Sequence, residues 1–402
     1  GFEHLVDWPA VAIVLRQHEP SVRSHGRDPV HVERLLSEVI VVDLHPLADA
    51  AHTAAAGRAR HEERLAVVAG SAEEAAAKLL ALDGPRGRAP SAAPRVAFLF
   101  TGQGSTVPGA GRGLYEAQPA FRKSLDRSAA TLGLDPARLL DEGSQAGHYA
   151  LQLALVDLWA SRGVRPSAAM GHSLGEFAAA TAAGALDAAD ALRLLVDRQR
   201  ILDTFATRGR MASVRAPLES ILPLVEAHRG EVAIAAVNGP AEVVLSGRGE
   251  AVEAVARGAG ARLEWLAVPH AFHSPLLEPA LAPFEARCAE VPVREPRIAL
   301  VANPTGEFAG PGYGTPAYWR RHLREPVRFA DGLGTLADAG FRVFVEIGPK
   351  PALLALGRRA LPDLAGALWI PSLRAGDEVA GWLESLGELF VHGVDAIPGP
   401  GR

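Results

Sequence analysis

The residues best suited to chemistry are a serine in a glycine-bounded turn and two histidines much further along the chain. The stretch Gly171-His172-Ser173-Leu174-Gly175 fits the pattern G-x-S-x-G, with an apolar strand-like run before it and helix-like sequence after it. In this pattern the glycines allow a sharp turn that presents the Ser173 hydroxyl as a nucleophile. The amide of Leu174, at the start of the helix, could then face a developing oxyanion. An ordinary strand–helix turn is the alternative interpretation.

A nucleophilic serine needs a general base, and the stretch His270-Ala271-Phe272-His273 can supply one. We predict that it lies where two parts of the fold meet, a position at which clefts and functional loops are common. A dyad of Ser173 and His273 is compatible with this placement. Because the chain contains 14 histidines, a structural or surface role remains open for each of them.

On spacing alone, two further side chains are best interpreted as ordinary surface or core residues. Arg198 lies in a predicted amphipathic helix over residues 191–202, where its neighbours Arg193 and Arg200 favour an ordinary solvated charge. Cys288 is the one cysteine of the chain. A single cysteine excludes an intramolecular disulfide framework and a Cys-rich zinc site, and we expect Cys288 in the core.

Composition excludes several classes of function. The 402 residues are 48% hydrophobic and 22% charged, which is typical of a globular protein. Lys and Arg total 41 against 46 Asp and Glu, a net charge of −5, so we expect no nucleic-acid groove. No apolar run is long enough for a membrane span and no signal peptide is evident, so we expect a cytoplasmic protein. We also expect a piece of a longer chain, because position 1 is not Met.

Strand-like and helix-like runs alternate through most of the chain, which predicts an α/β fold with a parallel sheet. The apolar run Val96–Phe100 is a strand buried on both faces, and it leads into a loop, residues 101–105, that can present backbone amides. Together with the serine turn, this arrangement predicts a large domain like that of α/β-hydrolases, with a nucleophile elbow.

The pattern between residues 210 and 268 differs, because its elements follow the order βαββαβ of a ferredoxin-like fold. The first part of the chain forms a separate α/β unit, with strands predicted at 39–42 and 65–68. A helix over 72–82 follows, capped by Ser71. The predicted domains are a linker unit 1–92, the large domain in two halves 93–208 and 270–370, a ferredoxin-like insert 209–269, and a trailing linker 371–402.

Several motifs occur in an order that is typical of one family. They are 102–105 (GQGS), 171–176 (GHSLGE), the Arg198 helix, 209–214 (GRMASV), 237–240 (VNGP), 270–274 (HAFHS) and 346–349 (EIGP). Over residues 94–370 the chain resembles the acyltransferase domain of type I polyketide synthases, relatives of the malonyl-CoA:acyl carrier protein transacylases. Stretches 47–53 and 57–61 resemble the linker between ketosynthase and acyltransferase, and 371–374 resembles the linker that follows. An iterative synthase, such as the enediyne type, is one conceivable parent.

The resemblance implies a role for each site residue. It makes Ser173 the nucleophile, His273 the general base, and the backbone amides of Gln103 and Leu174 the oxyanion hole; the Gln103 side chain also borders the substrate. Arg198 would hold the free carboxylate of the extender unit, because a guanidinium binds a carboxylate through paired hydrogen bonds.

No catalytic acid is implied, because backbone carbonyls orient the histidine in this family, and the carbonyl of Arg328 is our candidate. No bound cofactor and no metal are implied.

The implied substrate is malonyl-CoA and the implied acceptor is the phosphopantetheine thiol of an acyl carrier protein domain. Neighbouring partners would be the ketosynthase and other domains of the same polypeptide. His270 and Phe272 would line the acyl pocket, where Phe272 fills the space that an α-methyl group needs. Leu174 also favours malonyl over methylmalonyl. A methylmalonyl-selective transferase, a serine hydrolase that acts on acyl thioesters, and a non-catalytic docking piece are the alternatives.

Overall fold

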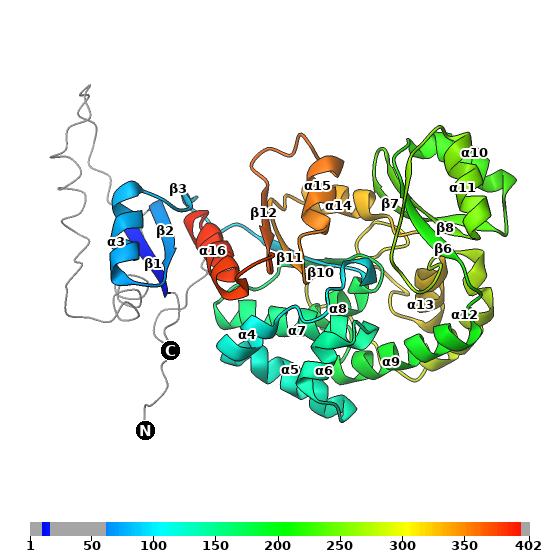
Figure 1. Cartoon of the computed structure of the whole chain (residues 1–402), viewed down its shortest axis with the longest axis horizontal. Coiled ribbons are helices and arrows are strands. Elements are labelled where there is room, and N and C mark those ends of the chain that lie inside the picture. Colours follow the sequence, from blue (N-terminus) through cyan, green and yellow to red (C-terminus); the bar gives the residue numbers. More distant parts are fainter. Residues whose placement is uncertain (1–9, 17–61, 395–402) are drawn as a thin grey trace. The chain divides into compact units, whose positions relative to one another are not determined.

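The computed structural model describes residues 10–16 and 62–394 of the chain (Figure 1). The strand predicted at 39–42 and the linker-like stretches 47–53 and 57–61 lie outside the described residues. The chain divides into two compact units. The larger contains Arg95–Leu158 and Pro166–Leu373, and the smaller combines the N-terminal part with Trp159–Arg165 and the C-terminal part that begins at Arg374.

A five-stranded parallel sheet forms the centre of the larger unit. Its strand order is β10-β5-β4-β11-β12, and every neighbouring pair is parallel. All residues of β4, β5 and β11 are buried, as expected for strands covered on both faces. The bounds are β4 Val96–Phe100, β5 Ala168–Gly171, β10 Ala299–Val301, β11 Val343–Ile347 and β12 Leu368–Pro371.

Helices cover this sheet and connect its strands (Figure 1). Their bounds are α4 Arg112–Ala117, α5 Pro119–Leu132, α6 Pro136–Asp141, α7 Gln145–Ser161, α8 Gly175–Ala182, α9 Ala188–Phe205, α12 Glu278–Cys288, α13 Pro316–Arg324, α14 Phe329–Asp338 and α15 Leu353–Ala360. The α/β fold with a parallel sheet is therefore confirmed. The elbow turn lies between β5 and α8, at the carboxyl end of the strand, where α/β folds bind ligands.

The ferredoxin-like insert is also confirmed, as a four-stranded antiparallel sheet of order β7-β8-β6-β9. Its helices α10 and α11 lie on one face of this sheet (Figure 1). The helices and strands enclose a separate apolar core that includes Ile221, Val252 and Leu245. The bounds are β6 Arg210–Val214, α10 Leu218–Ala227, β7 Val232–Gly239, β8 Glu242–Gly247, α11 Gly249–Gly258 and β9 Leu263–Trp265.

Some elements differ from the sequence patterns. The predicted pattern of the insert runs to residue 268, whereas its last strand ends at Trp265. Beyond the insert, a 3-10 turn, Pro275–Leu277, precedes α12. The turn is separate because the Ser274 side chain caps it and accepts a hydrogen bond from the Leu276 amide. Strand β12 was not predicted, because its short apolar run lies at the sheet edge next to a predicted tail.

The smaller unit is an antiparallel sheet of order β1-β2-β3 with two helices. Ser71 caps the first helix as predicted, because its side chain accepts the amide hydrogen of Glu74. The C-terminal helix packs against β2 closely enough that a Cβ at Gly387 would lie 2.8 Å from the Ala66 Cβ. The bounds are β1 Ala10–Arg16, β2 Glu63–Ala69, α3 Ala72–Ala81, β3 Arg86–Arg88 and α16 Glu378–Val391.

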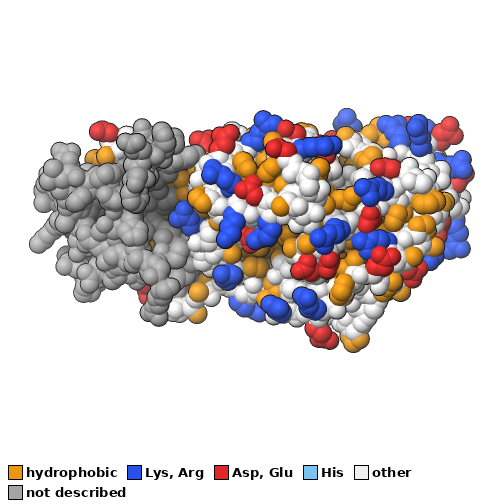
Figure 2. All heavy atoms as spheres, turned by 90° about the horizontal axis from the view of Figure 1, so that it is seen from below, with side chains coloured by type: hydrophobic (Ala, Val, Ile, Leu, Met, Phe, Trp, Pro, Cys, Tyr) orange, Lys and Arg blue, Asp and Glu red, His pale blue; other side chains and the backbone are white. Residues whose placement is uncertain are grey.

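The surface of the described part is mixed in charge. Figure 2 shows Lys and Arg side chains interspersed with Asp and Glu on the face drawn there. Among the described residues, none of the helices combines the length and the apolar character that a membrane crossing requires.

The contact between α8 and β4 gives a direct test of the packing. We expect Gly175→Ala to lower the thermal unfolding midpoint, because a Cβ would lie 2.2 Å from the carbonyl oxygen of Phe100. Such overpacking costs about 1–3 kcal/mol. Gly334→Ala in α14 is the matched control, because a Cβ there meets no atom within 4 Å. Circular dichroism melts that coincide for the two variants would contradict this account of the packing.

Candidate active site

Ser173 lies at the sharp turn between β5 and α8 in an unusual backbone conformation. Its φ angle is +51°, in the left-handed region that non-glycine residues rarely adopt. Gly171 must lack a side chain here, because a Cβ would lie 2.1 Å from the Glu176 amide nitrogen. The two glycines of the motif therefore permit close packing on both sides of a strained serine, as the elbow pattern predicts.

The structure brings the predicted dyad together. The Oγ atom of Ser173 lies 2.7 Å from Nε2 of His273. On the other side of the ring, Nδ1 of His273 donates a hydrogen bond of 2.8 Å to the backbone carbonyl of Glu325. Since a carbonyl only accepts, Nδ1 carries the proton and Nε2 is free to accept the serine proton. His273 also has a positive φ, +59°.

The prediction that the Arg328 carbonyl orients the histidine is wrong. Arg328 caps α14, and its carbonyl accepts the amide hydrogen of Gly332 in the first turn of that helix. The carbonyl of Glu325, three residues earlier, is free of helical bonding and takes the role. The sequence placed the correct loop near the histidine, but only the tertiary fold decides which carbonyl of the loop points at the ring.

Burial and charge keep His273 neutral. Desolvation, reinforced by the positive charge of Arg198, lowers the pKa of His273 to about 3. His172 and Arg324 act in the same direction, and the Glu325 carbonyl opposes them. A neutral imidazole is the form that can accept a proton from a serine hydroxyl.

The two predicted oxyanion donors lie on neighbouring chain segments. Strands β4 and β5 are adjacent and parallel, with Phe100 opposite Gly171, so the loop with Gln103 and the turn with Leu174 begin side by side. A Cβ at Gly102 would lie 2.8 Å from the His172 carbonyl, which shows how closely they approach. Within the described residues, the amides of Gln103 and Leu174 donate no hydrogen bond, so both remain available.

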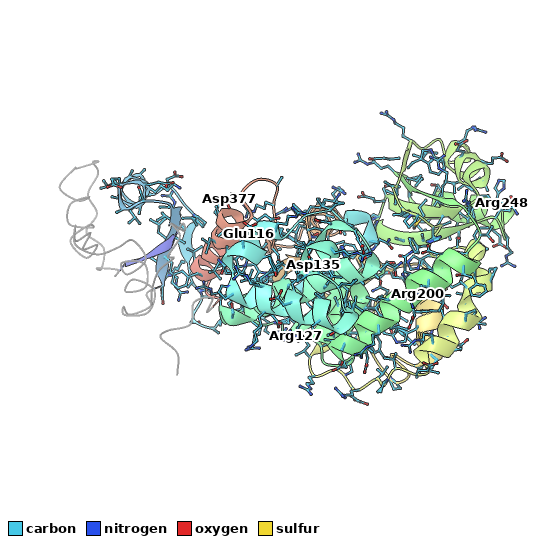
Figure 3. All side chains as sticks on the ribbon, turned by 60° about the horizontal axis from the view of Figure 1, so that its bottom comes forward. Glu116, Arg127, Asp135, Arg200, Arg248 and Asp377 are labelled. Carbon is cyan, nitrogen blue, oxygen red and sulfur yellow. The ribbon has the colours of Figure 1, made fainter. Side chains whose placement is uncertain are left out.

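Arg198 is not a solvated charge. Only 1% of the residue is exposed, whereas the side chain of Arg200 on the same helix is 76% exposed and lies on the outer surface (Figure 3). Nη1 of Arg198 donates to Oε1 of Gln145, and Nε of Arg198 has no hydrogen-bond partner among the described residues. Among the described residues no Asp or Glu pairs with it, and burial lowers the pKa of Arg198 to about 10. In the described part of the chain, this guanidinium is a buried cation without a counter-ion.

Aromatic rings surround this cation. The Arg198 guanidinium carbon lies 5.5 Å from the ring centre of Phe272, and 6.0 Å from those of Phe177 and Phe284. Rings at this distance stabilise a cation modestly and exclude water. His270, also predicted at the site, contacts Phe272 edge-on at 5.7 Å and lies 2.9 Å from Oδ1 of Asp203.

A buried hydrogen-bond network stabilises the turn that carries Ser173. Oδ1 of Asn303 accepts the amide hydrogen of Ser173 at 2.6 Å, and its Nδ2 donates to the Gly171 carbonyl at 2.7 Å. Glu176 accepts the Asn303 amide hydrogen and the Tyr318 hydroxyl hydrogen. Burial raises the pKa of Glu176 to about 7. These hydrogen bonds fix the strained turn from both sides of the serine.

The insert reaches the site through its VNGP motif. Oδ1 of Asn238, at the end of β7, lies 2.8 Å from Nε2 of His172, next to the nucleophile. Val327, in the loop that carries the Glu325 carbonyl, exchanges backbone hydrogen bonds with β7. The insert therefore holds the loop that orients His273 and also contacts the serine turn.

Sequence reasoning did not identify Asn303, Gln145, His322 or the Glu325 carbonyl. His322 donates from Nε2 to the Ser173 carbonyl at 3.2 Å, and it lies on α13. A signal existed for Asn303, which follows β10 in a sheet whose carboxyl ends meet at one edge. Residues 62–394 contain no group of three His, Cys, Asp or Glu side chains suited to a metal ion. Cys288 is buried and free.

Comparisons with known proteins agree with this geometry. The model of the acyl transferase domain family matches residues 97–396, and a CurL-like polyketide synthase C-terminal model matches residues 42–79. The chain is 39% identical over 364 residues to mycoketide-CoA synthase of Mycobacterium tuberculosis. That match covers 85% of this chain, which spans 9% of the length of that curated relative.

Two solved structures share the fold. The acyltransferase domain from the second module of the salinomycin polyketide synthase is 36% identical, with a TM-score of 0.78 and coverage of 95% and 94% of the two chains. A type II acyl carrier protein in complex with its malonyl-transacylase contains a chain that is 26% identical, with a TM-score of 0.65 and coverage of 72% and 99%. The chain therefore belongs to the acyl transferase domain family, in the branch found in type I polyketide synthases.

The low pKa of His273 predicts that the reactivity of Ser173 stays nearly constant as the pH falls below neutral. We expect the rate of labelling by a fluorophosphonate to change less than about twofold between about pH 8 and pH 5. A base with the ordinary histidine pKa of about 6.5 would lose most of its activity over this range. Intact mass spectrometry measures the rate, and Ser173→Ala is the control that should take no label. Half-loss near pH 6.5 would contradict a neutral, buried base.

Proposed function

We propose that this domain transfers a malonyl extender unit from malonyl-CoA to the phosphopantetheine thiol of an acyl carrier protein. The observation that carries the proposal is the buried guanidinium of Arg198, which has no acidic partner among the described residues and lies beside the Ser173–His273 pair. A buried cation without a counter-ion is costly, and a substrate carboxylate would neutralise it. The proposed substrate is therefore an acyl group with a free carboxylate.

The first half of the proposed reaction acylates the serine. Oγ of Ser173 attacks the thioester carbonyl carbon while Nε2 of His273 takes its proton. The amides of Gln103 and Leu174 hold the negative charge on the carbonyl oxygen. The carbon–sulfur bond then breaks, and the imidazolium of His273 gives its proton to the departing coenzyme A thiolate. Malonyl-Ser173 remains.

The second half repeats these steps with a different thiol. His273 takes the proton of the phosphopantetheine thiol, whose sulfur attacks the ester carbonyl. The carbon–oxygen bond to Ser173 breaks and the serine recovers its proton. This is a ping-pong sequence with a covalent intermediate, which needs neither a metal nor a bound cofactor.

The choice of malonyl over methylmalonyl rests on Phe272. Its ring is 6% exposed and lies against the Arg198 guanidinium, so it occupies space beside the carboxylate that Arg198 would hold. An α-methyl group would need part of this space. Because one methyl group changes binding by only about 1–3 kcal/mol, the expected selectivity is substantial but finite.

A serine hydrolase acting on acyl thioesters shares the dyad, yet it has no use for a buried arginine. The partner of the transfer follows from the family context. The related malonyl-transacylase was solved in complex with a carrier protein, which supports an acyl carrier protein as the acceptor here. Relatives many times longer than this chain support neighbouring synthase domains as further partners.

Replacing the buried cation tests the proposed function. We expect Arg198→Ala to slow malonyl loading at least about 30-fold while sparing acetyl loading, because it removes one partner of a buried charge pair. Intact mass after exposure to malonyl-CoA or acetyl-CoA measures both rates. Arg200→Ala is the matched control on the same helix, and Ser173→Ala should gain no mass. An unchanged preference for malonyl would refute the proposal that Arg198 binds the substrate carboxylate.

Replacing Phe272 tests the selectivity. We expect Phe272→Ser to raise the rate of methylmalonyl loading relative to malonyl loading by about 10-fold or more, because it vacates the space beside Arg198. Phe272→Tyr keeps the ring and should keep the preference. Competition between malonyl-CoA and methylmalonyl-CoA for the same protein, read by mass, gives the ratio. Equal ratios for the parent chain and Phe272→Ser would show that another residue sets selectivity.

A further inference from the structure

A buried histidine outside the dyad binds both ends of the loop that carries Gln103. His148 lies on α7 and is 2% exposed. Its Nε2 lies 2.9 Å from the backbone carbonyl of Thr101, where the loop leaves β4. Its Nδ1 lies 3.1 Å from the hydroxyl of Thr106, where the loop ends. One imidazole therefore spans the whole loop.

The partners fix the protonation of this ring. The Thr101 carbonyl can only accept, so Nε2 of His148 carries the hydrogen. Nδ1 is then an acceptor, and the Thr106 hydroxyl donates to it. Gln152, one helical turn further along α7, also donates to the Thr101 carbonyl, at 2.8 Å. Burial lowers the pKa of His148 to about 4, so the ring stays neutral at physiological pH.

Apolar packing is incomplete at the end of this loop, next to Thr106. A small cavity borders Thr106 and His148 and is otherwise lined mainly by the side chains of Val107, Leu139, Leu140 and Leu151. Inside the loop the hydrogen bonds are local, from the amide of Ser105 to the Gly102 carbonyl and from the amide of Thr106 to the Gln103 carbonyl. These bonds shape the turn but do not fix its position against the sheet.

We propose that His148 is a positioning residue that holds the Gln103 amide in place to stabilise the oxyanion. The hydrogen bond from His148 to Thr101 ties the start of the loop to α7, and the bond from Thr106 ties its end to the same helix. The amide of Gln103 lies between these two points. This inference rests on the proposed function only in assigning the Gln103 amide to the oxyanion. An oxyanion donor that is lost costs about 10²- to 10³-fold in rate, and a displaced donor costs part of that.

The test removes the hydrogen bonds of His148 in the full chain, first at the Thr106 end and then at both ends. We expect Thr106→Val to lower the maximum rate of Ser173 acylation by malonyl-CoA about tenfold, with the half-saturating concentration changed less than about twofold. Thr106→Ser keeps the hydroxyl and should restore the rate. His148→Leu should slow acylation more than Thr106→Val, and His148→Gln, which retains a donor and an acceptor, should recover part of it.

A matched control separates positioning from stability. Tyr149→Phe removes a buried hydroxyl on the same helix, one that bonds Thr181 and not the loop. It should lower the thermal midpoint without changing the acylation rate. If Thr106→Val and His148→Leu lower only the midpoint, in the manner of Tyr149→Phe, the positioning role is wrong.

A fluorophosphonate provides a readout that does not depend on the acyl group. It reacts with an activated serine and places an oxygen in the oxyanion hole, so Thr106→Val should slow its reaction while Thr106→Ser should not. A parent chain that reacts with the fluorophosphonate but takes no malonyl group would refute the proposed function alone. Fluorophosphonate rates that are equal in the parent chain and in Thr106→Val would refute the positioning role alone.

Discussion

The hydrogen bond between Ser173 and His273 is the interaction that most of the larger unit is arranged to maintain. Both residues have a left-handed backbone, a conformation that costs about 1–3 kcal/mol each and persists only where its surroundings enforce it. Asn303 and Glu176 enforce it at the serine, and the Glu325 carbonyl orients the histidine. The segment after β10, helix α8 and the end of α13 each supply one of these residues, so the geometry of the pair depends on all three.

Charge is the second constraint on the site. Arg198 places a cation among three aromatic rings, with no Asp or Glu partner among the described residues, and the low local dielectric strengthens its field. Desolvation and, to a smaller extent, this field lower the pKa of His273, and the field would favour a ligand that carries its own negative charge. One buried charge thus affects the protonation of the base and, in the proposed function, the choice of substrate. The exposed Arg200, two residues further along the same helix, can do neither.

The loops at the carboxyl ends of β4 and β5 complete the arrangement. Their backbones approach too closely for a Cβ at Gly102 or Gly175, so the two free amides begin from adjoining positions. The buried side chains of Thr101, His148 and Gln152 lie beneath the first of these loops. The proposed oxyanion site therefore depends on these buried hydrogen bonds as well as on the sequence motif that contains Gln103.

Sequence patterns predicted the α/β order and the ferredoxin-like insert, and the family motifs paired Ser173 with His273, whose Oγ and Nε2 atoms lie 2.7 Å apart. Each of these leaves a local mark, because strand length, helical period and glycine spacing act between near neighbours in the chain. Tertiary structure alone decided that the Glu325 carbonyl, not that of Arg328, orients the base, and that Arg198 is buried while Arg193 and Arg200 are exposed. Contacts between residues far apart in sequence set burial and carbonyl direction, and no local pattern records them. Gln145 and Asn303 became visible for the same reason, once the fold placed them against Arg198 and Ser173.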